Sequence, residues 1–354
     1  MALLLAILLS MEQSYGPYAR PANGGDAAIA PARGGALLAW SEDYRIRVAL
    51  LDSRGRLASA IHDLPVTRAR TLATAPAAAF DGRSFLVAWN ERSSGGDQTI
   101  AMLFDLDGAP LGTPQRYGDA GVVNNPPPLR LVWDGASYRL WTGRDELRIA
   151  RDGAILSASA SAAPQGVAAS NGTVATVSSK TTPGIICSTL GIPLPPCSRY
   201  SMNWTAGPRT GSYFVQRDAT RIVSPPAIAA AGDTFAVAWS LPSEITYVIT
   251  GGPASSFAAT SDATVAPGLA CDNEQCLLAY SQSGDVHALV FPVDRPYSPE
   301  MLTIAATERF ERAPQVHALG PDRFLVSYRS DGTDGMRLNS RMVTFGDARR
   351  RSMR

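Results

Sequence analysis

Residues 76–89 read Pro-Ala-Ala-Ala-Phe-Asp-Gly-Arg-Ser-Phe-Leu-Val-Ala-Trp, and this stretch decides the fold. Proline suits the start of a strand because it has no N–H group, and Asp-Gly between two apolar runs is typical of a tight hairpin turn. In the second run Phe85, Val87 and Trp89 lie on one face of the strand, and a leucine and an alanine lie on the other. Both faces are apolar, so the sequence predicts a hairpin whose second strand is buried on both sides.

The same pattern recurs along the chain with the period of a repeat fold. Six prolines are each followed, 13 or 14 residues later, by the end of an apolar strand, and a seventh copy without the proline ends at Trp40. The end points lie about 48 residues apart on average, which is a spacing typical of propeller blades. The pairs are Pro76–Trp89, Pro128–Trp141, Pro164–Val177, Pro226–Trp239, Pro267–Tyr280 and Pro314–Tyr328.

Each repeat has room for four strands. After Trp89 a polar stretch leads to an apolar run at 100–104, then to a turn that ends at Gly108, and then to a weaker strand near Leu111. The first repeat has the same order and places its last strand near Leu57. The sequence therefore predicts an all-β fold, a β-propeller of seven four-stranded blades, with six or eight blades as the alternatives. A helical solenoid is excluded because no segment beyond the first ten residues keeps helical spacing.

Closure of the ring and the domain limits follow from the ends of the chain. The last repeat supplies only three strands, so we expect the N-terminal segment around 15–26 to add the outer strand and seal the ring. The predicted organisation is a signal-like apolar segment at 1–14, a single propeller at 15–346 with an insertion at about 180–224, and a basic C-terminal tail at 347–354.

Composition narrows the partners and the location. The chain of 354 residues carries 32 basic and 31 acidic residues without a basic stripe, so we predict no nucleic-acid partner. The apolar segment at 1–10 is too short to span a bilayer and is similar to the apolar region of a secretory signal, although it lacks the usual basic start. The alternative is an N-terminal strand that docks on the ring. We expect a monomeric extracytoplasmic protein, either secreted, periplasmic or on the cell surface, without a transmembrane span.

Four cysteines form two close pairs. Cys271 and Cys276 flank the first hairpin of the sixth repeat, where facing residues lie close enough for a disulfide. Cys187 and Cys197 bracket nine residues in the longest gap between repeats. Zinc is the competing interpretation, but neither spacing is usual for zinc ligands. We predict two disulfides, no metal site and an oxidising compartment.

Catalytic motifs are scarce in this sequence. It contains no G-x-S-x-G, no H-E-x-x-H and no phosphate-binding glycine loop, and its histidines, His62, His287 and His317, are scattered over separate strands. Asp-Gly dipeptides recur, and we interpret their aspartates as turn formers rather than calcium ligands. The sequence predicts no cofactor.

The loops between the second and third strands hold the remaining polar groups. In propellers these loops commonly lie on the ligand-bearing face, around the central channel. The candidate ligand-binding residues there are Glu42, Asp43, Glu91, Arg92, Arg144, Asp145 and Arg329. Converging carboxylates and guanidiniums can bind a polar ligand or perform acid–base chemistry on a glycosidic bond, and the alternative is a solvated loop face.

Three functional hypotheses follow, and no residue is assigned a catalytic role. One of them is a module that docks a larger envelope assembly through the insertion near 180–224, and the other two are the following. The first is a non-enzymatic scaffold that binds an unknown protein or glycan ligand. The alternative is a carbohydrate-active hydrolase or lyase that uses carboxylates such as Glu42, Glu91 or Asp145.

The repeats resemble those of secreted bacterial β-propeller proteins. Blades of that family read roughly P-x-(I/V)-A-x-D-G-x-x-(F/Y)-L-V-(A/V)-W, then I-x-A-x-x-(L/F)-D-x-x-G. Residues 76–111 are similar to both halves, and residues 226–239, 267–280 and 314–328 are similar to the first half. The resemblance implies an extracytoplasmic propeller and no particular activity, and the sialidase motif S-x-D-x-G-x-T-W is absent here.

Overall fold

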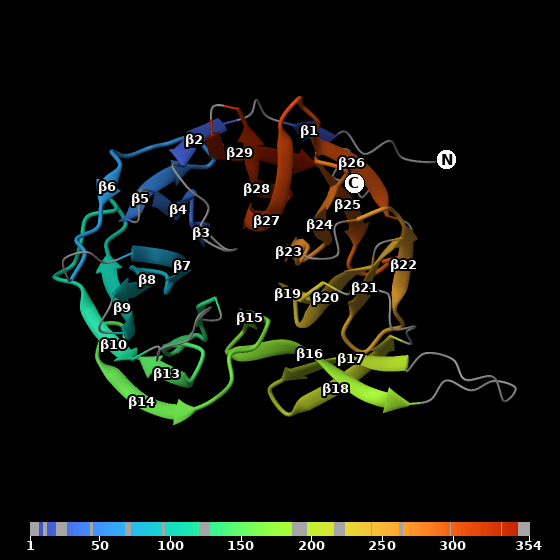
Figure 1. The fold of residues 1–354 in the computed structure, drawn as a ribbon, viewed down its shortest axis with the longest axis horizontal. Coiled ribbons are helices and arrows are strands. Elements are labelled where there is room, and N and C mark those ends of the chain that lie inside the picture. The colour runs from blue at the N-terminus through green and yellow to red at the C-terminus, as the bar shows by residue number, and fades with distance from the viewer. Residues whose placement is uncertain are drawn as a thin grey trace, which may run out of the picture.

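The structure, a computed structural model, is a ring of seven antiparallel sheets around a central axis (Figure 1). It describes residues 7–9, 13–18, 27–42, 45–67, 72–93, 96–119, 128–185, 197–215, 224–241, 243–261, 265–297, 299–333 and 335–345. The chain builds one sheet after another, and in blades 1 to 6 each sheet follows chain order from the innermost strand outward. The predicted β-propeller of seven four-stranded blades is therefore confirmed.

The strands of the first four blades follow in chain order. Blade 1 comprises β3 (Ala27–Ala32), β4 (Gly35–Glu42), β5 (Arg45–Asp52) and β6 (His62–Asp63). Blade 2 comprises β7 (Leu72–Phe80), β8 (Phe85–Ser93), β9 (Gly96–Phe104) and β10 (Gln115–Asp119). Blade 3 comprises β11 (Arg130–Trp133), β12 (Tyr138–Trp141), β13 (Asp145–Ile149) and β14 (Ile155–Ala160). Blade 4 comprises β15 (Gly166–Ser170), β16 (Thr173–Ile185), β17 (Cys197–Ala206) and β18 (Arg209–Val215).

The last three blades complete the ring. Blade 5 comprises β19 (Ala227–Ala231), β20 (Thr234–Leu241), β21 (Glu244–Ile249) and β22 (Ser255–Ala258). Blade 6 comprises β23 (Gly268–Cys271), β24 (Gln275–Gln282), β25 (Asp285–Pro292) and β26 (Glu300–Ala305). Blade 7 comprises β27 (Phe310–Gly320), β28 (Arg323–Gly332) and β29 (Gly335–Phe345), together with the N-terminal strands β1 (Ile7–Leu9) and β2 (Gln13–Tyr18).

The N-terminus closes the last blade, as predicted, but through an earlier segment. Both β1 and β2 pair with the same edge of β29, with Ile7 opposite Phe345 and Tyr18 opposite Met336. The eleven residues of β29 give room for two short partners in series. Residues 19–26 of the segment expected here lie outside the described residues, as do 1–6 and the C-terminal tail.

Several strands lie at positions that differ from the predicted ones. The outer strands of blades 1 and 2 lie at 62–63 and 115–119, after the predicted positions Leu57 and Leu111. Leu57 makes an isolated bridge instead, and in blade 2 Pro110, next to Leu111, makes one. In blade 4, β17 and β18 lie within the range that the repeat spacing assigned to an insertion. Within the described residues there is no helix long and apolar enough to cross a membrane.

The repeated aromatic residues pack between blades, which confirms their predicted structural role. Trp89, Trp239 and Tyr328 are 1%, 2% and 1% exposed, and each contacts the preceding blade. Burial of side chains this large is the main stabilising term of such a ring.

The predicted alignment of blade 3 is wrong by one residue. Arg130 pairs with Trp141 in the way that Ala77 pairs with Ala88, so Thr142 occupies the position of Trp89. Successive side chains of a strand point to opposite faces, and Trp141 therefore faces blade 4 instead of blade 2. Val177 of blade 4 is displaced in the same way and packs against blade 5.

Candidate functional site

The upper face of the ring, defined as the face that carries the loops between second and third strands, holds the predicted carboxylates. Glu42 ends β4 and is 8% exposed. Its carboxylate accepts a hydrogen bond of 2.9 Å from Trp40 Nε1 and forms an ion pair of 2.7 Å with Arg47. Burial lowers the pKa of Arg47, but hydrogen bonds to Asp63 and Glu42 outweigh it and raise the pKa overall. Glu42 therefore joins two strands of blade 1.

Glu91 repeats this arrangement in blade 2. It is 2% exposed and accepts hydrogen bonds from Trp89 Nε1 at 3.1 Å, from the Thr67 backbone N–H at 3.0 Å and from the Thr67 hydroxyl. Residues two apart on a strand share one face, so Trp-x-Glu places the carboxylate against the indole N–H. This Trp-x-Glu signal is present in the sequence, and sequence reasoning missed it.

The remaining predicted residues lie apart from one another. Arg92 pairs with Asp97 in its own hairpin at 3.3 Å, whereas Arg144 is exposed and Asp145 half-buried beside the turn of blade 3. Arg329 is buried in β28 of blade 7, at 9% exposure. Asp43 lies outside the described residues. The structure thus distributes the described candidates over blades 1, 2, 3 and 7.

Blade 7 has a polar cluster at its upper end that the sequence did not single out. Arg309 donates from Nε to the Ser330 hydroxyl at 2.8 Å and from Nη2 to the Gly335 carbonyl oxygen at 2.7 Å. Arg312 pairs with Asp331 at 2.8 Å. Glu311 is only 1% exposed and accepts a hydrogen bond from the Thr307 hydroxyl.

The opposite face carries the aspartate turns. Their carboxylates accept hydrogen bonds from backbone N–H groups of their own turns, as shown by Asp52, Asp81, Asp105, Asp134, Asp152 and Asp272. Burial raises the pKa of Asp134, but the N–H groups of Ser137 and Ala136 and the guanidinium of Arg148 outweigh it, so the pKa is lowered overall. The prediction that the aspartates of Asp-Gly pairs form turns is confirmed for Asp81, Asp134 and Asp152, whereas Asp331 lies in β28 and pairs with Arg312. Within the described residues, no group of three or more metal-binding side chains comes together.

The predicted disulfide of blade 6 is also confirmed. Cys271 and Cys276 face each other across the first hairpin, with their Cα atoms 4.0 Å apart, and they are bonded. Cys187 lies outside the described residues, so its predicted bond to Cys197 stays a prediction.

The contact surfaces between neighbouring blades, here called seams, are closed by buried apolar clusters at six of seven positions. Each such cluster contains a large aromatic residue: Trp40 at seam 7/1, Trp89 at 1/2, Tyr138 at 2/3, Trp239 at 4/5, Tyr280 at 5/6 and Tyr328 at 6/7. In the part of the chain that the structure describes, no buried apolar cluster joins blades 3 and 4. We call this junction the open seam.

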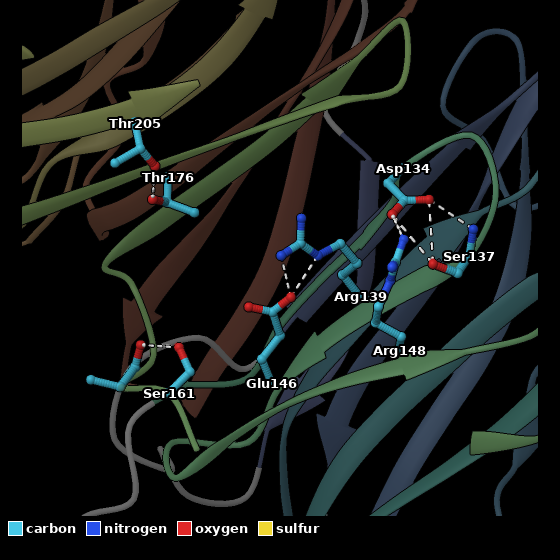
Figure 2. A network of polar contacts seen from close by, with 9 residues as sticks. Asp134, Ser137, Arg139, Glu146, Arg148, Ser161, Thr176 and Thr205 are labelled. Atoms are coloured by element: carbon cyan, nitrogen blue, oxygen red, sulfur yellow. Dashed lines mark hydrogen bonds and ion pairs between the residues drawn. The ribbon is translucent and has the colours of Figure 1, made fainter. Parts of the chain in front are cut away.

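Blade 3 presents a charged wall to the open seam. Its apolar side chains, such as Leu140 and Leu147, pack on blade 2, and the alternate residues face blade 4. These include Trp141, which is 2% exposed and has the Arg139 guanidinium 5.2 Å from the centre of its ring. Arg139 stands directly opposite Arg148 on this wall. Two like charges in such a pair repel each other, and each is paired with an acid (Figure 2): Arg139 with Glu146, and Arg148 with Asp134 at 3.3 Å.

Blade 4 presents a hydroxyl-rich wall. Val177, Met202 and Trp204 pack on blade 5, so the alternate residues of β16 and β17 face blade 3. The hydroxyls of Thr176 and Thr205 are hydrogen-bonded to each other at 2.8 Å on this wall (Figure 2). In register, the described side chains of the wall are Val174, Thr176, Ser178 and Lys180 on β16, Ser201, Asn203 and Thr205 on β17, and Thr210 and Ser212 on β18.

Near the axis a single arginine bridges the open seam. Arg130 of β11 donates from Nε to the Gln165 carbonyl oxygen of blade 4 at 3.0 Å. It makes no ion pair among the described residues, and burial lowers its pKa. Blades 3 and 4 also approach each other directly at the turns between their first and second strands, where a Cβ added to Gly135 would lie 3.6 Å from the Gly172 Cα atom. At seam 6/7 a Cβ added to Gly268 would lie 2.8 Å from the Pro314 carbonyl oxygen, so the backbones approach more closely there.

Comparisons with known proteins identify the fold and no family. No protein-family model matches this chain, and no curated protein sequence matches it. The WD40 domain of coronin from Toxoplasma gondii is similar in structure, with 8% identity and a TM-score of 0.52, over 98% of this chain and 88% of that one. At that identity the likeness shows the propeller fold alone.

Two further solved structures are more distant. A protein of unknown function from Dyadobacter fermentans is 10% identical, with a TM-score of 0.48, over 95% of this chain and 99% of that one. A Trypanosoma rangeli sialidase mutant displaying trans-sialidase activity is 8% identical, with a TM-score of 0.44, over 96% of this chain and 58% of that one.

Proposed function

We propose that this protein is a non-enzymatic, extracytoplasmic β-propeller that acts as a scaffold for a protein or glycan ligand. The proposal rests on the burial and the hydrogen bonding of the candidate carboxylates. Glu42 and Glu91 are buried, and each accepts hydrogen bonds from an indole N–H and from a second residue of its own blade or of the segment leading into it. A general acid or base must present its proton or lone pair to a substrate, and these carboxylates present theirs to the scaffold.

The extracytoplasmic part of the proposal is supported by the Cys271–Cys276 disulfide, because such bonds persist in oxidising compartments. Export can be tested by fusing alkaline phosphatase after Phe345, because that enzyme becomes active only where its disulfides can form. Activity in intact cells is expected for an exported fusion. An inactive fusion that becomes active after transfer to an oxidising buffer would contradict export.

The scaffold itself is tested by measuring binding and turnover on the same ligands. The purified chain is screened against a glycan array and a peptide array, and each bound glycan is then incubated with the protein and analysed for shortened or unsaturated products. Binding without product formation is the expected result. Product formation that is lost in Glu42→Gln or Glu91→Gln would establish the alternative, a carbohydrate-active hydrolase or lyase.

A further inference from the structure

The open seam differs from the other six in what its exposed groups can bind. Arg148 is 51% exposed, and Asn203 and Thr205 on the facing wall are exposed as well. The positions of seam 1/2 that correspond to Asn203 and Thr205 are Ile100 and Met102 of β9, and both are buried. The outer parts of the walls of blades 3 and 4 therefore remain accessible to water, while the two blades contact each other near the axis and at the turns that carry Gly135 and Gly172.

A ligand in the open seam can contact the two walls only through side chains. Both walls are faces of sheets, and the backbone groups of β12, β13, β16 and β17 are engaged in ladders on both sides. An extended peptide that binds by strand addition needs an unpaired strand edge, which these faces do not offer. Hydroxyl, amide and guanidinium groups are what the walls do offer, and these groups match the hydroxyls and carboxylates of sugars.

The charge of the open seam favours a negatively charged ligand. Among the described side chains, four cations face the open seam, namely Arg130, Arg139, Arg148 and Lys180, against the two acids Glu146 and Asp134. Arg148 uses one N–H, from Nη2, in its contact with Asp134, and its side chain is 51% exposed. A guanidinium placed this way can bind a carboxylate through two parallel hydrogen bonds.

We propose that the open seam binds a segment of an acidic polysaccharide whose sugars carry carboxylates. Arg148 and Lys180, on opposite walls, bind the carboxylates, and Thr205, Asn203 and Ser212 hydrogen-bond the sugar hydroxyls. The proposal deepens the scaffold function and rests on it. It assigns the ligand class and the place of binding.

The test uses the full chain and titrates it with polygalacturonate, with dextran as a neutral polysaccharide and poly-L-glutamate as an acidic polypeptide. Arg148→Gln and Lys180→Gln each remove one charge from the open seam. Arg295→Gln is the matched control, because Arg295 is 69% exposed on blade 6, away from the seam. Thr205→Val keeps the size of the side chain and removes a hydroxyl.

We expect polygalacturonate to bind and dextran and poly-L-glutamate to bind at least tenfold more weakly. Arg148→Gln and Lys180→Gln should each weaken polygalacturonate binding by about tenfold, as expected for the loss of a charge-assisted contact, while Arg295→Gln should bind like the wild type. Each variant should have the same melting temperature as the wild type, which shows that the ring is intact.

Each contrary outcome is informative about a different claim. Polygalacturonate binding that is equal in the Arg148, Lys180 and Arg295 variants would overturn the open seam as the site and leave the scaffold function standing. Equal binding of poly-L-glutamate would overturn the assignment to a polysaccharide. Absence of polygalacturonate binding would overturn the inference, and cleavage of the polymer would overturn the non-enzymatic function.

Discussion

Two tryptophans at the same place in different blades allow one buried hydrogen bond to be measured. Trp89 of blade 2 and Trp239 of blade 5 both end the apolar part of the second strand and are 1% and 2% exposed. Trp89 Nε1 donates to Glu91 at 3.1 Å, whereas Trp239 Nε1 is buried without a hydrogen-bond partner among the described residues. Trp89→Phe and Trp239→Phe remove the same atoms, and only the first removes a hydrogen bond.

The difference between the two variants is set by that bond. A hydrogen bond to a charged group contributes about 1.5–3 kcal/mol to the free energy of unfolding. Both variants also replace the indole by the smaller phenyl ring, so this packing loss is common to the two. Trp239→Phe also removes a buried N–H group that has no partner, which lowers its cost further. For a chain of 354 residues, whose unfolding entropy is about 0.7 kcal/mol per degree, the melting temperature of Trp89→Phe should be about 2–4 °C below that of Trp239→Phe.

Differential scanning calorimetry of both variants measures this gap directly. A third protein, Trp89→Phe in a Glu91→Gln background, tests the assignment, because a neutral acceptor should reduce the penalty by about half. If Trp239→Phe melts at the same temperature as Trp89→Phe or below it, the Trp-x-Glu hydrogen bond is not what distinguishes the two blades.

Three further predictions concern acidity, packing and the disulfide. Burial lowers the pKa of His317 to about 4 from 6.5, so the unfolded chain binds the proton more readily; stability should fall by up to about 3 kcal/mol from pH 6.5 to pH 4, and urea titrations should show this slope lost in His317→Gln and kept in the exposed-histidine control His62→Gln. Gly268→Ala should destabilise by about 1–3 kcal/mol, because its Cβ meets the Pro314 backbone, and more than Gly166→Ala, whose Cβ meets the Val177 side chain at 3.0 Å; equal urea midpoints would refute this. Replacing Cys271 and Cys276 by serine should cost about 2 kcal/mol, measured against the reduced and oxidised wild type, and no change on reduction would contradict a bond that stabilises the hairpin.

The ring was predictable because its period is carried by several independent signals. The proline, the Asp-Gly turn and the two-sided apolar strand of residues 76–89 each predict part of a hairpin, and their recurrence predicts the blades. Outer strands were placed less well because they are exposed and short. The outer strand of blade 1, His62–Asp63, has no apolar pattern to locate it.

The site was less predictable because contacts across a seam join residues far apart in the chain. Counting from a proline aligns Trp141 with Trp89. This alignment places Trp141 on the wrong face of the blade 3 sheet. Counting from the turn instead gives the right result, since Trp89 lies eight residues after Asp81 and Thr142 eight after Asp134. Thr142 in place of a tryptophan was a visible signal that blade 3 departs from the repeat.

The polarity of the open seam is hard to explain by stability alone. An apolar cluster contributes roughly 25 cal/mol per Å² of buried area, and six seams have one. At the seventh, both walls depart from the pattern together: blade 3 turns Arg139 and Arg148 outward, and blade 4 faces them with threonine, serine and asparagine. One polar wall against an apolar one would leave buried polar groups unpaired, whereas two polar walls beside the buried Trp141 can pair with each other, with water or with a polar ligand. This pairing of the walls is why we assign binding to the open seam rather than to the upper face, where Glu42, Glu91 and Arg92 are bound within their own blades.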